Sequence, residues 1–354
     1  MERRIVILSF TRAGTGLNRI LCGTLQKNGR TCRGYAVEKY AGGDILPLPK
    51  DRQDLFREGW GRDAFLFVGA AGIAVRYIAP WVKDKYTDSP VLVIDETGRY
   101  VIPLLSGHVG GAAALADEIA GLTGAVSVHT TATDVRGKFA VDVFARKNDL
   151  LITDREMAKA ISSAVLEGER VALYVDCPGC TVKGDAPAEA AVCSGPEEAE
   201  RYRYRILIGD ACPEDKKAGT LLLKPRNIAA GIGCRKAVSP ELLEKGFREI
   251  LGGNGLEMGQ VKMIASIDLK KEEPALLHLS ETYGIPFVTY TAEELRRVAE
   301  VTSASGFVEK VTGVDNVCER AALLCGSGGT LIQGKCVRES MTAALVRCPA
   351  ELEF

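Results

Sequence analysis

Short apolar runs alternate with amphipathic stretches toward both ends of this chain, and this alternation limits its fold more than any other feature. Runs such as RIVILSF at residues 4–10 and AFLFVG at residues 64–69 are typical of buried strands. The stretches between such runs place apolar residues three and four positions apart, as in Leu115, Ile119 and Leu122. The pattern predicts an α/β protein, in which helices and strands form layers.

The alternation becomes irregular between residues 141 and 225. Apolar runs such as VALYVD and RILIGD occur there, but Pro, Gly, Ala and Glu separate them. We therefore predict two α/β domains that flank a smaller, irregular middle α/β segment. The amino-terminal domain would span 1–140, the middle region 141–225 and the carboxy-terminal domain 226–354, and a length of 354 residues suits two or three domains.

Local signals predict several element ends. Gly98 lies in a turn sequence between two apolar runs, which indicates a connection between neighbouring strands. Gly124 ends an amphipathic stretch, where a left-handed glycine commonly stops a helix. Ser239 precedes a proline and is expected to be an N-cap. Thr291 and Glu294 have the spacing of a capping box.

Charge and cysteine content exclude several classes of protein. The formal net charge is −1, so no overall basic field attracts nucleic acid or an anionic membrane. Apolar runs stay well below the roughly 18–20 residues of a membrane span. The basic and apolar start, MERRIVILSF, favours a first strand over a signal peptide. The 11 cysteines are scattered and odd in number, which favours reduced thiols and a cytoplasmic protein.

The segment PLLSGHVGG places Ser106 and His108 between a predicted strand and a predicted helix. Gly107, Gly110 and Gly111 would let the backbone turn sharply, and the first amides of a helix attract anions. Histidine exchanges protons near neutral pH, and only three occur in the chain. The turn therefore predicts an anion site with an acid or base. A purely structural helix cap explains the same residues equally well.

Similar turns follow other predicted strands. Glycine, hydroxyl and cationic side chains there favour a ligand with many anionic groups, because ligands of open α/β sheets lie beyond the carboxyl ends of strands. We expect substrate contacts from Gly69 and Gly72, from Thr130 and Thr131 near Thr133 and Asp134, from Gly231, Gly233, Cys234 and Arg235, and from Ser266, Asp268, Lys270 and Lys271.

Other chemistries receive less support. Gly14 and Gly16 follow the first strand, but Arg19 occupies the third glycine position of a dinucleotide fingerprint, and the chain has no P-loop motif. The CPGC segment at 177–180 has no second C-x-x-C to complete a zinc site, so we expect a loop with unligated thiols. Arg235 and Lys236 follow Cys234 and would favour its thiolate form, as a nucleophile requires. A packing role, as a small buried residue in the turn, explains Cys234 better.

Longer strings give a more specific indication. Segments including VIPLLSGHVGGAAALADEIAGLTGAVSVHTTATD, AAGIGCRKAVS, IASIDLKKEEPALLHLSETYGIPFVTYTAEEL and FVEKVTGVDNVCERAALL resemble the cobalt-precorrin-5A hydrolase family (CbiG) of anaerobic cobalamin biosynthesis. They occur in the family's order, over about 60–140 and 226–347. Two positions depart from the family pattern: Ala113 replaces a frequent asparagine and Ala237 a frequent glycine.

The resemblance implies a hydrolase that opens the ring-A δ-lactone of a cobalt corrinoid, after which the C20 fragment leaves as acetaldehyde. Cobalt would arrive within this tetrapyrrole substrate, so we expect no protein-bound metal and no separate cofactor. We expect His108 to act as acid or base and Ser106 to hold an oxyanion or carboxylate with the amides of Gly110 and Gly111. A corrinoid carrier without catalysis is an alternative, and a nicotinamide-dependent oxidoreductase is a weaker one.

Overall fold

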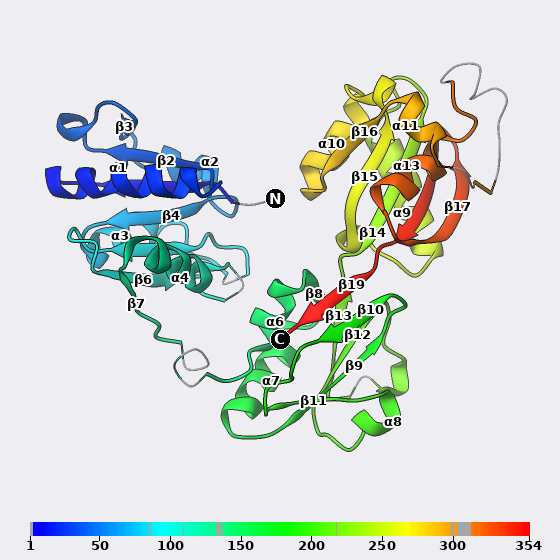
Figure 1. The fold of residues 1–354 in the computed structure, drawn as a ribbon, viewed down its shortest axis with the longest axis horizontal. Coiled ribbons are helices and arrows are strands. Elements are labelled where there is room, and N and C mark those ends of the chain that lie inside the picture. The colour runs from blue at the N-terminus through cyan, green and yellow to red at the C-terminus, as the bar shows by residue number, and fades with distance from the viewer. Residues whose placement is uncertain are drawn as a thin grey trace. The chain divides into compact units, whose positions relative to one another are not determined.

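The computed structural model of the chain describes residues 3–84, 86–108, 110–131, 135, 137–216, 218–298, 301–302 and 313–354. The chain forms two compact units, Met1–Lys138 and Phe139–Phe354. Both units combine helices with parallel or mixed sheets, so the predicted α/β class is confirmed (Figure 1). None of the helices in these ranges is long and apolar enough to cross a membrane.

A single sheet organises the described part of the first unit. Its strand order is β3-β2-β1-β4-β5-β6-β7. The first five strands run parallel, β6 runs antiparallel to β5, and β7 runs parallel to β6. The turn at Gly98, with φ 71°, joins β5 to β6 as predicted. The strands are β1 (Ile5–Ser9), β2 (Cys32–Ala36), β3 (Ile45–Pro47), β4 (Ala64–Val68), β5 (Val91–Ile94), β6 (Tyr100–Leu105) and β7 (Val126–Ser127).

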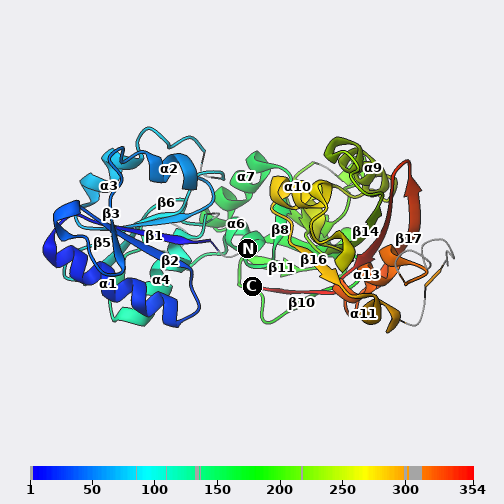
Figure 2. The same ribbon diagram turned by 90° about the horizontal axis from the view of Figure 1, so that it is seen from above.

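Helices cover both faces of this sheet (Figure 2). On one face, Leu21 and Ile119 pack with Ile7 in one apolar cluster. On the other face, Phe56 packs with Phe67. The predicted stop at Gly124 is confirmed, with φ 77°. Helices α1 (Arg12–Lys27) and α4 (Ala112–Thr123) form the first layer, α2 (Asp54–Gly59) and α3 (Ala71–Ile78) the second, and a short 3₁₀ helix spans Glu38–Tyr40.

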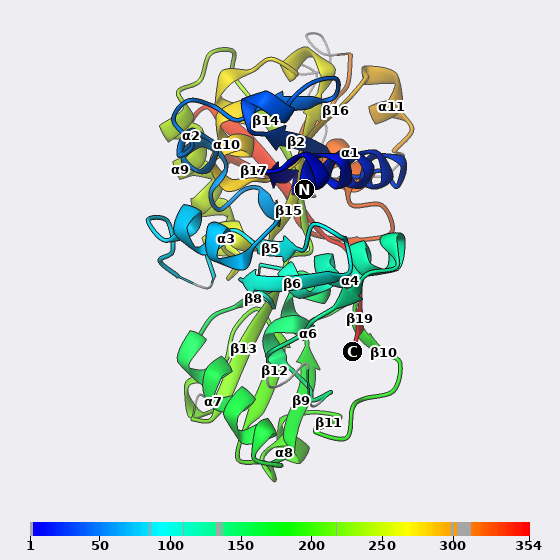
Figure 3. The same cartoon turned by 90° about the vertical axis from the view of Figure 1, so that its left-hand side faces the viewer.

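The second unit contains two five-stranded sheets in its described residues. The first of them, which we call the middle sheet, has the order β11-β9-β12-β13-β8, with β8 antiparallel at one edge (Figure 3). Its strands are β8 (Leu150–Ile152), β9 (Val171–Asp176), β11 (Ala190–Val192), β12 (Arg205–Gly209) and β13 (Thr220–Pro225). The accompanying helices are α6 (Val141–Lys147), α7 (Arg155–Leu166) and α8 (Pro196–Ala199).

The second of them, the carboxy-terminal sheet, has the order β16-β15-β14-β18-β17. Strands β14, β15 and β16 are parallel, so their carboxyl ends share one edge. Ser239 caps α9 through a 3.2 Å bond from Leu242 N, and the capping box of Thr291 and Glu294 is present. The strands are β14 (Ile228–Cys234), β15 (Val261–Ile267), β16 (Phe287–Tyr290), β17 (Thr330–Arg338) and β18 (Met341–Arg347). The helices are α9 (Pro240–Gly253), α10 (Pro274–Tyr283), α11 (Ala292–Arg296) and α13 (Val317–Cys325), with 3₁₀ turns at Glu214–Lys216, Met258–Gln260 and Asp268–Lys270.

A small two-stranded parallel sheet joins the middle segment to the last residues of the chain. Strand β10 (Cys180–Lys183), from the middle segment, pairs with β19 (Ala350–Glu353), the last strand of the chain. Leu352 is fully buried in the apolar cluster of the middle sheet. The chain therefore leaves the carboxy-terminal sheet and returns to the middle segment, a pairing that the sequence pattern did not predict.

Candidate functional site

The segment from Ser106 to Gly111 turns the chain from the end of β6 into α4. Gly111 is the N-cap of α4 and has φ 91°. Ser106 also has a positive φ, of 55°, which is uncommon for a residue with a side chain. Such a conformation costs on the order of 1–3 kcal/mol and persists only where surrounding contacts hold it. The contacts of Ser106 therefore hold it in this conformation.

The first amides of α4 are engaged within the turn itself. The sequence predicted that the amides of Gly110 and Gly111 would point outward to an anion. The Gly111 amide instead donates to the carbonyl of His108 at 3.1 Å, so it already has an acceptor. The next two amides are occupied in the same way, Ala112 N by Ser106 O at 3.1 Å and Ala113 N by Gly107 O at 3.0 Å.

The hydroxyl of Ser106 is also engaged. Ser106 is buried, and its Oγ donates to the backbone carbonyl of Asp88 at 3.1 Å. The Asp88 carboxylate accepts bonds from the Lys83 amide at 2.9 Å and from Trp60 Nε1 at 3.1 Å. This hydrogen-bond network holds the end of β6 against the loop that precedes β5. The sequence pattern did not indicate this role of Asp88, because Trp60 and Ser106 lie 28 and 18 positions from it along the chain.

A second segment reaches the same turn. After β7 the chain continues beside β6, with Val128 N bonded to Val101 O at 2.9 Å, and Thr131 Oγ1 lies 3.9 Å from the Cβ position of Gly107. Thr130 and Thr131 are exposed, and His108 is half-buried. Thr131 and the turn at Gly107 are therefore neighbours, as a shared site requires. The predicted Thr133 and Asp134 lie outside the described residues.

The structure adds a histidine–carboxylate pair to this segment. Nε2 of His129 lies 2.7 Å from Asp117 Oδ1 on α4 and 3.0 Å from Ser127 Oγ. The sequence pattern alone indicates no partner for His129. Helical periodicity places Asp117 on α4, but only the packing of α4 beside β7 brings the two together.

Gly69 and Gly72 lie at the opposite edge of the same sheet. Gly69 N donates to Ile94 O, at the end of β5, whereas Leu105 pairs with Val91, at its beginning. Because a strand rises about 3.3 Å per residue, roughly 10 Å of β5 separates these positions. Gly69 and Gly72 therefore lie beyond the carboxyl ends of the parallel strands, whereas the Ser106–Gly111 turn lies at the other end of the sheet, so these two turns do not gather at one end. The physical reason is the antiparallel direction of β6.

At the carboxy-terminal sheet, two of the predicted glycines serve packing. A Cβ on Gly231 would lie 1.9 Å from the carbonyl oxygen of Cys318, so this glycine allows α13 to approach β14. A Cβ on Gly233 would meet Thr342 Oγ1 at 2.7 Å. Arg235, which follows β14, is exposed, and its amide donates to Ser340 O at 3.0 Å. Arg235 thus presents a charge to solvent from this loop, as does the neighbouring Lys236.

The loop after β15 lies beside Arg235, and its predicted residues differ in environment. Ser266 is fully buried, and its hydroxyl donates to Ile232 O at 2.7 Å. Lys270 Nζ lies 2.8 Å from an oxygen of buried Glu273, so its charge is already paired. Asp268 and Lys271 are exposed. Of the predicted cations, Arg235 and Lys271 are therefore the ones placed to meet a ligand.

Cys234 does not fit the role of a nucleophile. Burial raises the pKa of Cys234 to about 11, and the Coulombic effect of Lys270 offsets this only partly. A thiol with this pKa is protonated near neutral pH and is a poor nucleophile. Arg235 and Lys236 are exposed, so solvent screens the charges that were expected to favour a thiolate. The structure thus favours packing for Cys234.

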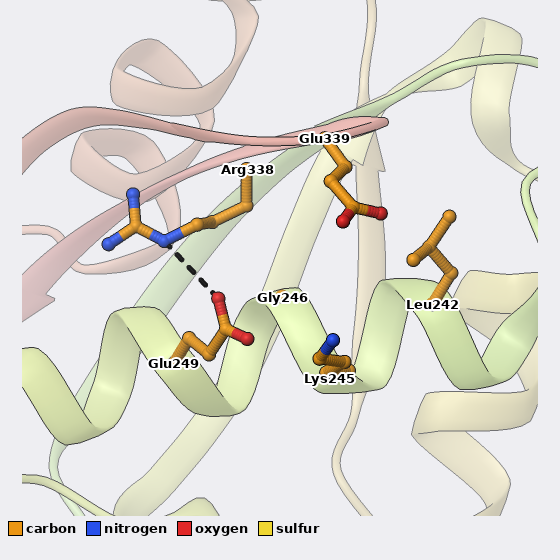
Figure 4. Close-up of a pocket in the computed structure, with 6 residues that line it drawn as sticks. All are labelled: Leu242, Lys245, Gly246, Glu249, Arg338 and Glu339. Atoms are coloured by element: carbon orange, nitrogen blue, oxygen red, sulfur yellow. Dashed lines mark ion pairs between the residues drawn. The ribbon is translucent and has the colours of Figure 1, made fainter.

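A small pocket lies near the same edge, between α9 and the hairpin of β17 and β18 (Figure 4). Arg338 Nε lies 3.5 Å from Glu249 Oε2 across its mouth. Gly246 leaves room for Met341, whose Sδ would lie 2.9 Å from a Cβ there. None of the predicted site residues lines this pocket. The lining residues are Leu242, Lys245, Gly246, Glu249, Arg338 and Glu339.

Three family models match successive parts of the chain. Residues 54–134 match the family model described as cobalamin synthesis G N-terminal, 139–225 the cobalamin biosynthesis central region, and 228–346 the cobalamin synthesis G C-terminus. The chain belongs to the cobalamin synthesis G family. Within that family, the Ser106–Gly111 turn falls in the amino-terminal model and Arg235 in the carboxy-terminal one.

Individual relatives cover most of the chain. It is 34% identical to a cobalt-precorrin-5A hydrolase of Salmonella typhimurium over 95% of both proteins. It is 31% identical to a cobalt-precorrin-5A hydrolase of Priestia megaterium over 88% of this chain and 84% of the other. A solved cobalamin biosynthesis protein G homologue from Sulfolobus solfataricus is 24% identical, covering 98% and 97% of the two chains, with a TM-score of 0.44.

Proposed function

We propose that this member of the cobalamin synthesis G family is a cobalt-precorrin-5A hydrolase, which opens the ring-A δ-lactone of its substrate and releases the C20 fragment as acetaldehyde. The observation that carries the proposal is the 34% identity to a hydrolase of that name over 95% of each chain. The substrate is a tetrapyrrole with many carboxylates. Cobalt enters with the substrate, and the reaction takes place in the cytoplasm.

In this proposal His108 transfers the proton. Lactone opening needs a base to activate water and an acid to protonate the leaving alkoxide, and histidine does both near neutral pH. His108 is half-buried in a turn whose backbone is fixed by its own hydrogen bonds. Such a setting limits the movement of the imidazole relative to a bound substrate.

Ser106 holds this turn in shape. Its hydroxyl proton is donated to Asp88 O at 3.1 Å, so donation to an oxyanion requires that bond to break. We therefore assign Ser106 to positioning His108, and assign substrate contact to the neighbouring Thr130 and Thr131. Arg235 and Lys271, both exposed, bind peripheral carboxylates through charge-assisted hydrogen bonds.

The decisive experiment incubates the purified chain with cobalt-precorrin-5A and traps acetaldehyde as it forms. We expect release through many turnovers, together with a product that has gained water at the lactone. Tight binding of the corrinoid, with at most one acetaldehyde released per chain or release only at the uncatalysed rate, would instead support a carrier that shelters the intermediate. Absence of both binding and release would refute the assignment.

A further inference from the structure

Cys177 and Cys180 face each other across a tight turn at the start of β10. Cys180 N donates to Cys177 O at 3.1 Å, and Gly179 has φ 79°. Pro178 and Gly179 thus occupy the second and third positions typical of a type II turn, whose first and last Cα atoms lie within about 7 Å. Disulfides join Cα atoms about 4.4–6.8 Å apart. The turn therefore holds the two residues within bridging reach.

Hydrogen-bond donors point at both sulfur atoms. Arg347 Nη1 lies 3.2 Å from Cys177 Sγ, and Asn227 Nδ2 lies 4.0 Å from Cys177 Sγ and 3.7 Å from Cys180 Sγ. The same amide nitrogen donates to Cys348 O at 3.2 Å, which fixes the orientation of the Asn227 side chain. All of these side chains are buried. A guanidinium and an amide N–H stabilise a thiolate better than a neutral thiol.

The charges around Cys177 also favour its thiolate form. A hydrogen bond from Cys180 is the largest cause that lowers the pKa of Cys177, burial opposes it, and Arg347 lowers it further, so that the pKa is about 7. Asp210 acts against this, but its carboxylate is paired with Arg347 at 2.6 Å. The pKa of Cys180 is raised, because Cys180 donates its proton to Cys177. Near neutral pH, a thiolate on Cys177 is therefore present in a substantial fraction of the chains, beside a protonated Cys180.

We propose that Cys177 and Cys180 form a redox-active dithiol that is reversibly oxidised to an intramolecular disulfide by peroxide. This site is separate from the hydrolase chemistry, which does not use these residues. The geometry of the turn, with Arg347 and Asn227 donating to its sulfur atoms, carries the inference.

The reaction balances with peroxide as the oxidant. The Cys177 thiolate attacks one peroxide oxygen, so an S–O bond forms, the O–O bond breaks, and hydroxide leaves and takes a proton from solvent. Cys180 sulfur then attacks the Cys177 sulfur, the S–S bond forms, and the hydroxyl departs with the Cys180 proton as water. The two cysteines lose two electrons and the peroxide gains two, and an added dithiol reverses the change.

A second cysteine pair in the chain provides an internal comparison. Cys22 Sγ lies 3.1 Å from Cys32 Sγ, so these thiols are also neighbours. The pKa of Cys22 is also lowered, because Cys32 hydrogen-bonds to it, but burial and the negative charge of Asp44 oppose this shift. Both thiols face an oxygen, Cys22 that of Asn18 Oδ1 at 3.6 Å and Cys177 that of Pro178 O at 3.8 Å. The difference is the Arg347 guanidinium, which lies 3.2 Å from Cys177 Sγ. A neighbouring cation favours a thiolate, and a negative charge disfavours it. We therefore expect the Cys177–Cys180 pair to react first.

The test treats the reduced, full-length chain with increasing hydrogen peroxide, blocks the remaining thiols by alkylation, and maps disulfides by mass spectrometry of peptides. We expect the Cys177–Cys180 disulfide to appear at lower peroxide than any Cys22–Cys32 disulfide and to disappear with dithiothreitol. In the reduced chain, alkylation of Cys177 should rise with pH around a midpoint near 7. Retention of both Cys177 and Cys180 as alkylatable thiols at peroxide levels that oxidise Cys22 would overturn the proposal.

Variants distinguish the roles of Cys177 and Cys180. In Cys180→Ser the disulfide cannot form, and we expect a sulfenic acid on Cys177 that dimedone traps. In the matched control, Cys22→Ser with Cys32→Ser, the Cys177–Cys180 disulfide should form as in the parent. Arg347→Met should slow the peroxide reaction at neutral pH. If that variant fails to fold, the dimedone result on Cys180→Ser decides, and absence of the adduct would refute Cys177 as the attacking thiolate.

Discussion

Gly110 packs directly against Ser106: a Cβ atom on Gly110 would lie 2.3 Å from Ser106 Cβ and 2.6 Å from its carbonyl oxygen. The substitution Gly110→Ala therefore forces the turn to shift. We expect the free energy of unfolding to fall by about 1–3 kcal/mol, the usual cost of overpacking. Urea unfolding measures this.

The matched control for this substitution is Gly121→Ala in α4, where a Cβ would have no atom within 4 Å. Alanine is favoured over glycine inside a helix by roughly 0.5–1 kcal/mol, so this variant should be as stable as the parent or more stable. Equal stability of the two variants would mean that the Gly110 contact with Ser106 does not constrain the turn.

His108→Ala should lower the rate of acetaldehyde release by roughly 10²–10⁴-fold, the usual contribution of a general acid or base. Corrinoid binding should be retained, since the backbone of the turn is held by its own hydrogen bonds. The control is His278→Ala, because His278 is exposed on α10. A folded His108→Ala protein with parental turnover would leave His108 a structural residue of the turn.

Arg235→Ala should weaken corrinoid binding by about 1–3 kcal/mol, the value of a charge-assisted hydrogen bond. Affinity of the parent should also fall with added salt, because ions screen exposed charges. Arg203→Ala removes a cation of similar exposure from the middle region and should leave affinity unchanged. An Arg235→Ala variant that binds as tightly as the parent would place Arg235 outside the binding surface.

Lys270→Ala should act on stability rather than on binding. Its ammonium lies 2.8 Å from Glu273, which is 5% exposed at its side chain and also accepts a bond from Ala237 N at 2.9 Å. Loss of the lysine leaves a buried carboxylate without its counter-ion, which costs on the order of 3 kcal/mol. The double variant Lys270→Ala with Glu273→Gln should recover part of this loss. If the single variant unfolds like the parent, the pair is not important for stability.

Glu319 predicts a pH dependence of stability. Burial raises the pKa of Glu319, but bonds from the Thr302 hydroxyl, the Lys335 amide and the Thr302 amide, each of 2.6 Å, together lower it below the ordinary value. This stabilisation is therefore complete above about pH 4.3, the ordinary pKa of glutamate, and is lost as the pH falls through the lower folded pKa.

Glu319→Gln tests this assignment. The difference in unfolding free energy between the parent and this variant should be constant near neutral pH and should shrink as the solution is acidified below pH of about 4. Urea titrations at a series of pH values measure it. A difference that stays constant on acidification would show that the carboxylate charge of Glu319 does not contribute.

The sequence by itself determined the local elements and their ends. The turn at Gly98, the helix stop at Gly124, the N-cap at Ser239 and the capping box of Thr291 and Glu294 were all predicted and are all present. Each depends on side chains and backbone groups within a few residues of one another, so the pattern contains all the interacting partners. The α/β class follows from the same short-range periodicity.

Only the tertiary structure decided which of these turns share an edge and which charges remain available to a ligand. The β5–β6 pairing separates Gly69 from Ser106, although both follow a strand. Lys270 is paired with Glu273, and Arg347 reaches Cys177 across 170 positions of the chain. Such partners are selected by the packing of whole strands and helices, whose contacts depend on residues distant in sequence. No local pattern contains that information, since the same turn or cation looks alike whether its neighbour is solvent or a buried group.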